Sequence, residues 1–228
     1  SDNGACYEWG PYGFDQSSRK GFTQLHEGKA LQGVGGPGTY HSVGSAWSCL
    51  SNTPLRMYKH FNHEGGNCSP LLAHWPKGIS PKLHGKFEHQ PAHLIDLMAT
   101  CVDLAKAEYP LEVKGQKIVP LQGVSLKPTF SGKNLNRKNP IYWEHEGNRA
   151  IRIEKWKLVA KGANGAWELY DLEKDPNELS SLYGKPGYER LTAKLKTELT
   201  RLREQYKVPE DTRPLKKAPR TPQKKKKV

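Results

Sequence analysis

The spacing of apolar side chains changes in the second half of the chain, and this change restricts the fold more than any other feature. Residues 140–147, 149–160 and 166–175 alternate apolar and polar side chains and are rich in Ile, Val, Trp and Tyr, which is typical of half-buried strands. Turn-forming stretches, E-G-N, E-K and G-A-N-G, separate them. Residues 188–207 follow with helical spacing, and the side chains that share one side are Leu191, Leu195, Leu199, Leu202 and Tyr206. The pattern predicts a small antiparallel sheet with a helix lying across it.

The part of the chain before this sheet has a different character. Residues 1–52 are rich in Gly and Ser without a regular period, which favours long functional loops. The apolar run at 69–76 predicts a strand buried on both faces of a parallel sheet. Residues 90–110 predict a helix with Pro91 as its first residue. Its apolar positions are Leu94, Leu97, Met98, Cys101, Val102 and Ala105, and its polar stripe is His93, Asp96, Thr100 and Asp103. Residues 110–140 form a connector. We therefore expect an α/β domain over residues 1–130 and an α+β subdomain over 131–208.

The net charge of +13 is concentrated in one place. Residues 213–228 hold eight Lys and Arg and no acidic residue, which leaves +5 for the rest of the chain. We expect residues 209–228 to be a disordered basic tail. Non-specific contact with nucleic acid or another polyanion is one interpretation, and a solvated end without a partner is an equally good one. No run of about 18 apolar residues predicts a membrane span.

Four cysteines, Cys6, Cys49, Cys68 and Cys101, show neither C-x-x-C pairs nor the His spacing of a zinc site. An even number permits disulfides without requiring them. Cys101 lies in the apolar helical run, where a small core residue is the simplest interpretation.

Two candidate ligands stand at the start of the chain. Asp2 and Asn3 offer a carboxylate and an amide oxygen side by side, the hard donors that calcium or magnesium prefers. D-N-G is an equally good sequence for an Asx turn, and from this pair alone the turn is the favoured interpretation.

Two later groups of residues are also candidate functional sites. Lys59 stands five residues before Glu64 in the run K-H-F-N-H-E-G-G, and a cation beside a strand end of an α/β sheet suits an anionic ligand. A solvated lysine is the alternative. His145 lies between Glu144 and Glu146 in a predicted hairpin, where it could donate a proton or contact a substrate. A surface network of ion pairs would give the same pattern.

Several of these motifs together resemble one enzyme family. S-D-N-G at the start, N-T-P-L-R-M-Y-K-H-F-N-H-E-G-G-N-C-S-P-L-L-A-H-W-P at 52–76, H-L-I-D-L-M-A-T at 93–100, W-E-H-E-G-N-R-A-I-R at 143–152 and W-E-L-Y-D-L-E-K-D-P-N-E at 167–178 occur in the same order in the C-terminal half of formylglycine-dependent sulfatases, above all bacterial arylsulfatases. The resemblance covers residues 1 to about 207.

The resemblance implies an alkaline-phosphatase-like α/β fold, of which this chain would be the C-terminal part, followed by the small subdomain. It implies that Asp2 and Asn3 are calcium ligands, that Lys59 contacts the sulfate as a catalytic and substrate-binding residue, and that His145 approaches the mouth of the pocket, a looser match. The implied reaction is hydrolysis of sulfate esters, either aryl sulfates or sulfated small molecules and polysaccharides. The resemblance also implies export to the periplasm or the medium.

The chain departs from the family at the nucleophile. Formylglycine forms from Cys or Ser in C/S-x-P/A-x-R, and no such motif occurs here: residues 52–56 have Asn52 in that position, and residues 68–72 lack the Arg. We therefore expect the sequence to begin inside the active site and to be inactive alone. A phosphoesterase of the same superfamily and a polyanion-binding module acting through the tail are the alternatives.

Overall fold

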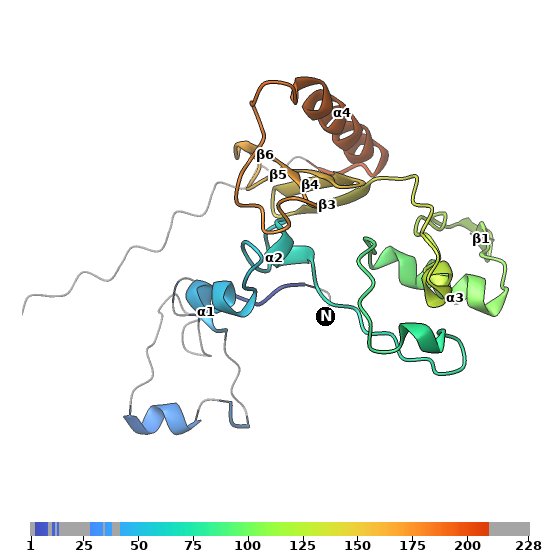
Figure 1. Ribbon diagram of the computed structural model, residues 1–228, viewed down its shortest axis with the longest axis horizontal. Coiled ribbons are helices and arrows are strands. Elements are labelled where there is room, and N and C mark those ends of the chain that lie inside the picture. The colour runs from blue at the N-terminus through green and yellow to red at the C-terminus, as the bar shows by residue number, and fades with distance from the viewer. Residues whose placement is uncertain are drawn as a thin grey trace, which may run out of the picture. The chain divides into compact units, whose positions relative to one another are not determined.

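The computed structural model describes residues 3–8, 11, 13, 28–33, 35–37 and 42–209, and Figure 1 shows their secondary structure. Contacts divide the chain into two units, residues 1–70 with 142–228 and residues 71–141. The domain boundaries at 130 and 208 remain a prediction. The helices of the described residues, with η for a 3-10 helix, are η2 (Gly28–Gly33), α1 (Gly44–Ser51), α2 (Glu64–Asn67), η3 (Pro81–Leu83), α3 (Ile95–Ala105), η4 (Lys127–Ser131) and α4 (Glu189–Gln205). The strands are β1 (Glu112–Val113), β2 (Gln116–Lys117), β3 (Ile141–His145), β4 (Asn148–Ile153), β5 (Trp156–Ala160) and β6 (Trp167–Asp171).

The first unit is built around a four-stranded sheet in the order β3-β4-β5-β6. The pairs β4–β5 and β5–β6 are antiparallel, with Ile151 opposite Leu158 and Leu158 opposite Leu169. Glu146 and Gly147 connect β3 to β4, and their φ angles of 51° and 77° are both positive, as the favoured two-residue hairpin turn requires. The predicted antiparallel sheet is confirmed.

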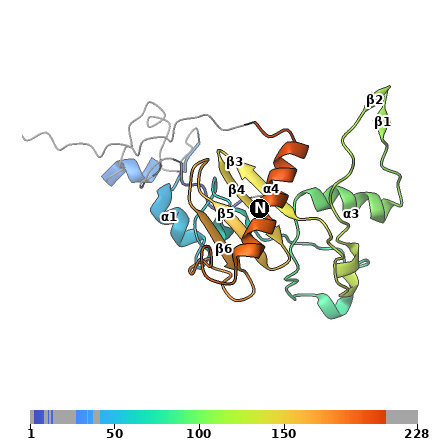
Figure 2. The ribbon, with the colours of Figure 1, turned by 90° about the horizontal axis from the view of Figure 1, so that it is seen from above.

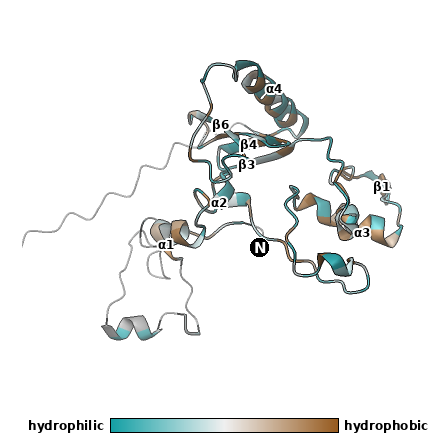
Figure 3. Ribbon diagram, viewed as in Figure 1, coloured by the Kyte–Doolittle hydropathy of each residue, from teal (hydrophilic) through white to brown (hydrophobic). Residues whose placement is uncertain are grey.

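Both faces of this sheet are covered. Ile151, Leu158 and Leu169 are fully buried against the leucines of α4, and α4 crosses that face in Figures 1 and 2. Figure 3 shows the apolar side of α4 turned toward the strands. Alternate positions of β4 to β6, among them Val159 and Tyr170, form a second cluster on the other face. The predicted class, α/β with a small antiparallel sheet and a C-terminal helix, is confirmed.

The second unit departs from two predictions. Residues 69–76 form no strand, and Leu72 is 94 % exposed. A strand needs a hydrogen-bonding neighbour, and no strand of the described residues pairs with this segment. Helix α3 begins at Ile95 instead of Pro91. It buries Asp96 and Thr100, while Leu94 and Met98 of the predicted core stripe are exposed.

The reversed face of α3 has a physical cause. Asp96 accepts hydrogen bonds from the backbone N–H groups of His93 at 2.7 Å and Val124 at 2.9 Å, and it forms an ion pair with Arg137. The Thr100 hydroxyl accepts one from the Leu126 N–H at 2.8 Å. Buried backbone donors need partners, and the polar face of α3 supplies them.

All four cysteines are free thiols, and Cys101 is exposed, so the prediction of a core cysteine was wrong. None of the helices in the described part of the chain is long and apolar enough to span a membrane.

Candidate functional site

The loop that carries Lys59 lies beside the first described residues of the chain. The Gly4 N–H donates to the carbonyl of Gly66 at 2.9 Å, and the Lys59 N–H donates to the carbonyl of Ala5 at 3.1 Å. Asn52 holds the two segments together: its Oδ1 accepts from the Ala5 N–H at 3.1 Å. Its Nδ2 donates to the carbonyls of Met57 at 2.9 Å and Gly65 at 2.8 Å. Residues 3–5 and the loop around Lys59 therefore form one packed structure.

Glycine is required on both sides of this contact. A Cβ on Gly4 would lie 1.8 Å from the carbonyl oxygen of Gly65, and a Cβ on Gly65 would lie 2.2 Å from the carbonyl oxygen of Met57. Contacts this short are impossible, so the glycines of D-N-G and of E-G-G permit the close backbone approach.

Lys59 shares a carboxylate with its neighbour in the sequence. The Lys59 ammonium lies 3.2 Å from Glu8 Oε1, and Nε2 of His60 lies 2.8 Å from the same oxygen. Burial opposes ionisation of Glu8, but the hydrogen bonds from His60 and Lys59 outweigh it and lower the pKa of Glu8. Lys59 keeps 35 % of its side chain exposed.

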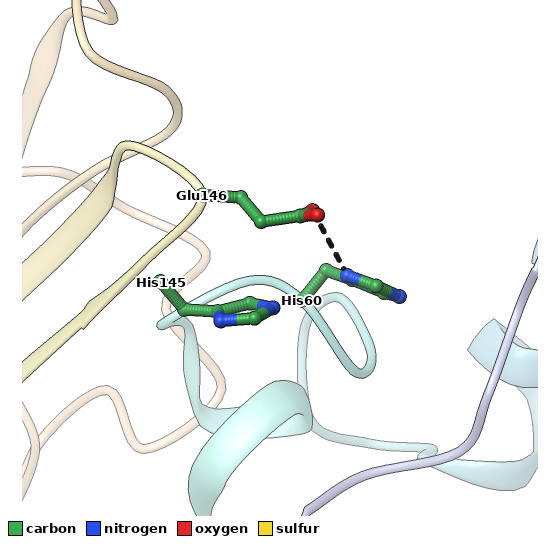
Figure 4. A group of neighbouring side chains, drawn as sticks. All are labelled: His60, His145 and Glu146. Atoms are coloured by element: carbon green, nitrogen blue, oxygen red, sulfur yellow. Dashed lines mark hydrogen bonds and ion pairs between the residues drawn. The ribbon is translucent and has the colours of Figure 1, made fainter. Parts of the chain in front are cut away.

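His60 connects this loop to the hairpin between β3 and β4. Its Nδ1 lies 3.0 Å from Glu146 Oε2, and its ring centroid lies 5.4 Å from that of His145. Figure 4 shows His145 and Glu146 extending from the hairpin end toward His60. Asn148 Nδ2 donates to the carbonyls of His60 at 2.8 Å and His145 at 3.0 Å, and thereby fixes the loop to the hairpin.

A deeper set of charges holds the E-G-G turn against the sheet. The Lys157 ammonium is fully buried and lies 2.6 Å from Glu64 Oε1 and 2.9 Å from Glu178 Oε1. Glu178 Oε2 accepts a hydrogen bond from the Glu64 N–H, at the start of α2. Burial works against ionisation of Glu64, yet the charge of Lys157 holds its pKa below the ordinary value.

Glu168 on β6 makes a second, partly buried contact to this loop. It forms an ion pair with Arg56 and accepts a hydrogen bond from the Tyr170 hydroxyl, and its other oxygen lies 3.4 Å from Nε2 of His63. Burial raises the pKa of Glu168, but the hydrogen bonds from His63, Tyr170 and Arg56 lower it to about 2. Arg56 and His63 flank Lys59 and His60 in the sequence, so these contacts fix the backbone of the site.

The structure places the predicted site residues as follows. Asp2 lies outside the described residues, as do residues 210–228 of the basic tail. The Asn3 amide donates from Nδ2 to the carbonyl of Gly4 at 2.8 Å, which directs Oδ1 the other way. Lys59 and His145 approach one another through His60 and Glu8. Sequence reasoning did not single out Glu8 or Asn148, because their partners lie about fifty and ninety residues away in the chain.

A separate hollow lies beside the turn between β4 and β5, with Trp156, Asp171 and Tyr188 in its wall. Lys59, His60 and His145 do not line it. Its position gives it no part in the chemistry of the Lys59 loop.

Comparison with known families shows to which family the chain belongs. The family described as N-sulphoglucosamine sulphohydrolase, C-terminal, matches residues 56–205, about two thirds of the chain. The chain belongs to this sulfatase family. The match begins at Arg56 and includes Lys59, the E-G-G turn, the hairpin with His145 and all of α4.

Relatives of this sulfatase segment are longer proteins. An uncharacterised sulfatase of Schizosaccharomyces pombe is 28 % identical over 159 residues, which are 67 % of this chain and 28 % of the relative. An N-acetylglucosamine-6-O-sulfatase of Bacteroides thetaiotaomicron is 28 % identical over 165 residues, 65 % of this chain and 27 % of the relative. A solved structure of a protein in complex with its substrate D-glucosamine-2-N,6-O-disulfate matches with 24 % identity and a TM-score of 0.49, covering 69 % of this chain and 33 % of that one. The sulfatase segment thus spans about a quarter to a third of the proteins it matches.

Proposed function

We propose that this chain is the C-terminal part of a sulfuric ester hydrolase that acts on sulfated carbohydrates or aryl sulfates. The observation that carries the proposal is the family match over residues 56–205, which contains the loop with Lys59 and its hydrogen bond to Ala5. The name of the Bacteroides relative, an N-acetylglucosamine-6-O-sulfatase, supports a sulfated sugar as substrate. The same relatives favour sulfate esters over phosphate esters.

In this proposal Lys59 neutralises an oxygen of the bound sulfate. Its side chain is partly exposed and its ammonium is paired with Glu8, and in the proposal a sulfate group lies beside that ammonium. Charge-assisted hydrogen bonds to an anion are about twice as strong as neutral ones, and a fixed cation stabilises charge that develops on the leaving oxygen. His145 would contact the remainder of the substrate from the hairpin end.

Calcium fits the hard oxygen donors at the start of the chain. The fixed amide of Asn3 can offer Oδ1, and Asp2 would add a carboxylate, but calcium requires about six to eight oxygens. The other ligands, and the formylglycine that this chain lacks, would come from residues outside it. When bound, calcium would supply positive charge to the sulfate oxygens.

The test measures release of sulfate from an aryl sulfate and from a sulfated glucosamine. We expect turnover from a longer protein in which a segment with C/S-x-P/A-x-R precedes residue 1, and none from the 228-residue chain. In the longer protein, Lys59→Met should lower kcat/KM by about 10²–10³-fold. Lys82→Met, which removes an exposed lysine of the second unit, serves as the control.

Two results would contradict the proposal. Turnover by the 228-residue chain alone would show that the missing nucleophile is not needed. Faster hydrolysis of phosphate esters than of sulfate esters by the longer protein would assign it to the phosphoesterases.

A further inference from the structure

The ring of His60 bridges two carboxylates. Nε2 lies 2.8 Å from Glu8 Oε1 and Nδ1 lies 3.0 Å from Glu146 Oε2. A neutral imidazole has one N–H and one lone pair, so it can donate to only one of these two acceptors. The other nitrogen and its carboxylate then present two lone pairs to one another, and a cation between them removes the repulsion.

His145 adds a third donor on the side of Glu146. A ring nitrogen of His60, a ring nitrogen of His145 and a carboxylate oxygen of Glu146 all lie within 4.8 Å of one another, and Figure 4 shows the three side chains around one point. We propose that His60, His145 and Glu146 form a binding site for a divalent transition-metal ion of the zinc type. This site is separate from the oxygen-rich calcium site proposed above and does not depend on sulfatase activity.

The donor set selects the class of ion. Imidazole nitrogens with one carboxylate suit Zn²⁺ and its neighbours, whereas calcium and magnesium take oxygen ligands. Zinc bonds of about 2.0–2.2 Å in a tetrahedron separate the ligand atoms by about 3.3 Å. The atoms of His60 and Glu146 already lie 3.0 Å apart, and all three donor atoms lie within 4.8 Å of one another, so closing the site requires mainly that the ring of His145 move inward by at most about 1.5 Å.

Glu8 completes the arrangement from outside. A histidine that binds a metal usually donates its other ring N–H to a carboxylate, which fixes the tautomer and raises the basicity of the ligating nitrogen. Glu8 stands in that relation to Nε2 of His60, and this leaves Nδ1 with its lone pair toward Glu146.

The backbone holds these donors in place before any ion arrives. His60 has a φ of 83° and Glu146 a φ of 51°, left-handed values that are uncommon outside glycine and that surrounding structure must maintain. Asn148 maintains them through its bonds to the carbonyls of His60 and His145. The Glu146 side chain is 31 % exposed, so an ion can enter from solvent.

The experiment titrates the 228-residue chain with ZnCl₂ in competition with a chromophoric chelator. Calcium is present in excess, so that oxygen-type sites are filled. We expect one Zn²⁺ per chain, with at least about tenfold weaker binding in His145→Ala and in Glu146→Gln. Glu8→Gln should weaken binding about 10–100-fold, as loss of an outer carboxylate does. His89→Ala, which removes an exposed imidazole of the second unit, should bind as the unchanged chain does.

A second readout identifies the ligands directly. Co²⁺ in place of Zn²⁺ should give visible absorption bands that His145→Ala alters and His89→Ala does not, and circular dichroism of each variant shows whether it is folded. Absence of stoichiometric Zn²⁺ binding would overturn the proposal. Binding that survives both His145→Ala and Glu146→Gln in folded protein would overturn it as well.

Discussion

Lys157→Met removes the ammonium group that two buried carboxylates share. Lys157 and Glu178 are fully buried and Glu64 is 7 % exposed, and the two carboxylates lie 2.6 and 2.9 Å from the ammonium nitrogen. Methionine has a similar length and shape, so packing changes little. The substitution therefore isolates the loss of charge from the loss of volume.

The expected cost follows from the two carboxylates that remain. Removing one partner of a buried ion pair destabilises a protein by about 3–5 kcal/mol, because the other charge stays buried without compensation. Domains have a total free energy of unfolding of about 5–15 kcal/mol, so a large part of the stability is lost. With a urea m-value of about 2 kcal/mol/M, the unfolding midpoint falls by about 2 M.

The assay is urea unfolding at neutral pH, followed by tryptophan fluorescence, with two comparisons. Lys194→Met removes an exposed lysine of α4 and should shift the midpoint far less. In a background of Glu64→Gln and Glu178→Gln, Lys157→Met should cost much less than in the unchanged chain, since no buried charge is left unpaired. A cost below about 1 kcal/mol in the unchanged chain, or an equal cost in both backgrounds, would refute the reasoning.

Two further predictions concern the same unit. Asn148→Ala should lower the free energy of unfolding by about 1–3 kcal/mol, because it leaves the carbonyl of His60 and the N–H of Gly162 without their partner; an unchanged urea midpoint would contradict this. The pKa of Glu168 is lowered from 4.5 to about 2. The ionised Glu168 therefore stabilises the folded protein fully above pH 4.5, and this stabilisation is lost as the pH falls toward 2. Its full value would be about 3 kcal/mol, and solvent screening of a carboxylate with 21 % exposure reduces it to about 1–2 kcal/mol. Glu168→Gln should flatten the acid limb of stability against pH, and an equally steep limb in the variant would count against this assignment.

The sheet and its helix were predictable because their signals are local. Each strand shows its own alternation, and each turn carries its own turn residues. Leu195, Leu199 and Leu202 share one side of the helix, and they are buried against one apolar face of the sheet. The local sequence pattern is sufficient to predict a fold where each element forms from its own residues and packs through its apolar face.

The charged core was not predictable in the same way. Lys157 alternates with apolar residues on β5, and this alternation predicts that its side chain faces solvent. The side chain is instead fully buried. Its partners stand about ninety residues before it and about twenty after it, and no sequence period connects such distant positions. Helix α3 shows the same limit, because Asp96 and Thr100 face inward to satisfy backbone donors of a later loop.

The sequence singled out residues of the candidate site one by one, but it did not predict the contacts between them. Lys59 and His145 stood out through motifs, whereas the structure joins them through Glu8, His60 and Asn148. Hydrogen bonds of this kind depend on where two loops meet in the folded chain. The sequence of either loop alone does not predict that position.

Depth separates the charges that hold the site from those that can exchange partners. Lys157 and its carboxylates lie where the penalty for an unpaired ion is several kcal/mol, so they stay paired and fix the E-G-G turn. Lys59 and Glu8 are partly exposed, and an ion pair in contact with solvent contributes less than a buried one, about 0–1 kcal/mol where it is fully exposed. An anion can therefore replace Glu8 beside Lys59 at small cost, provided that the deep charges keep the backbone in place. The buried network thus makes the shallow one available for binding.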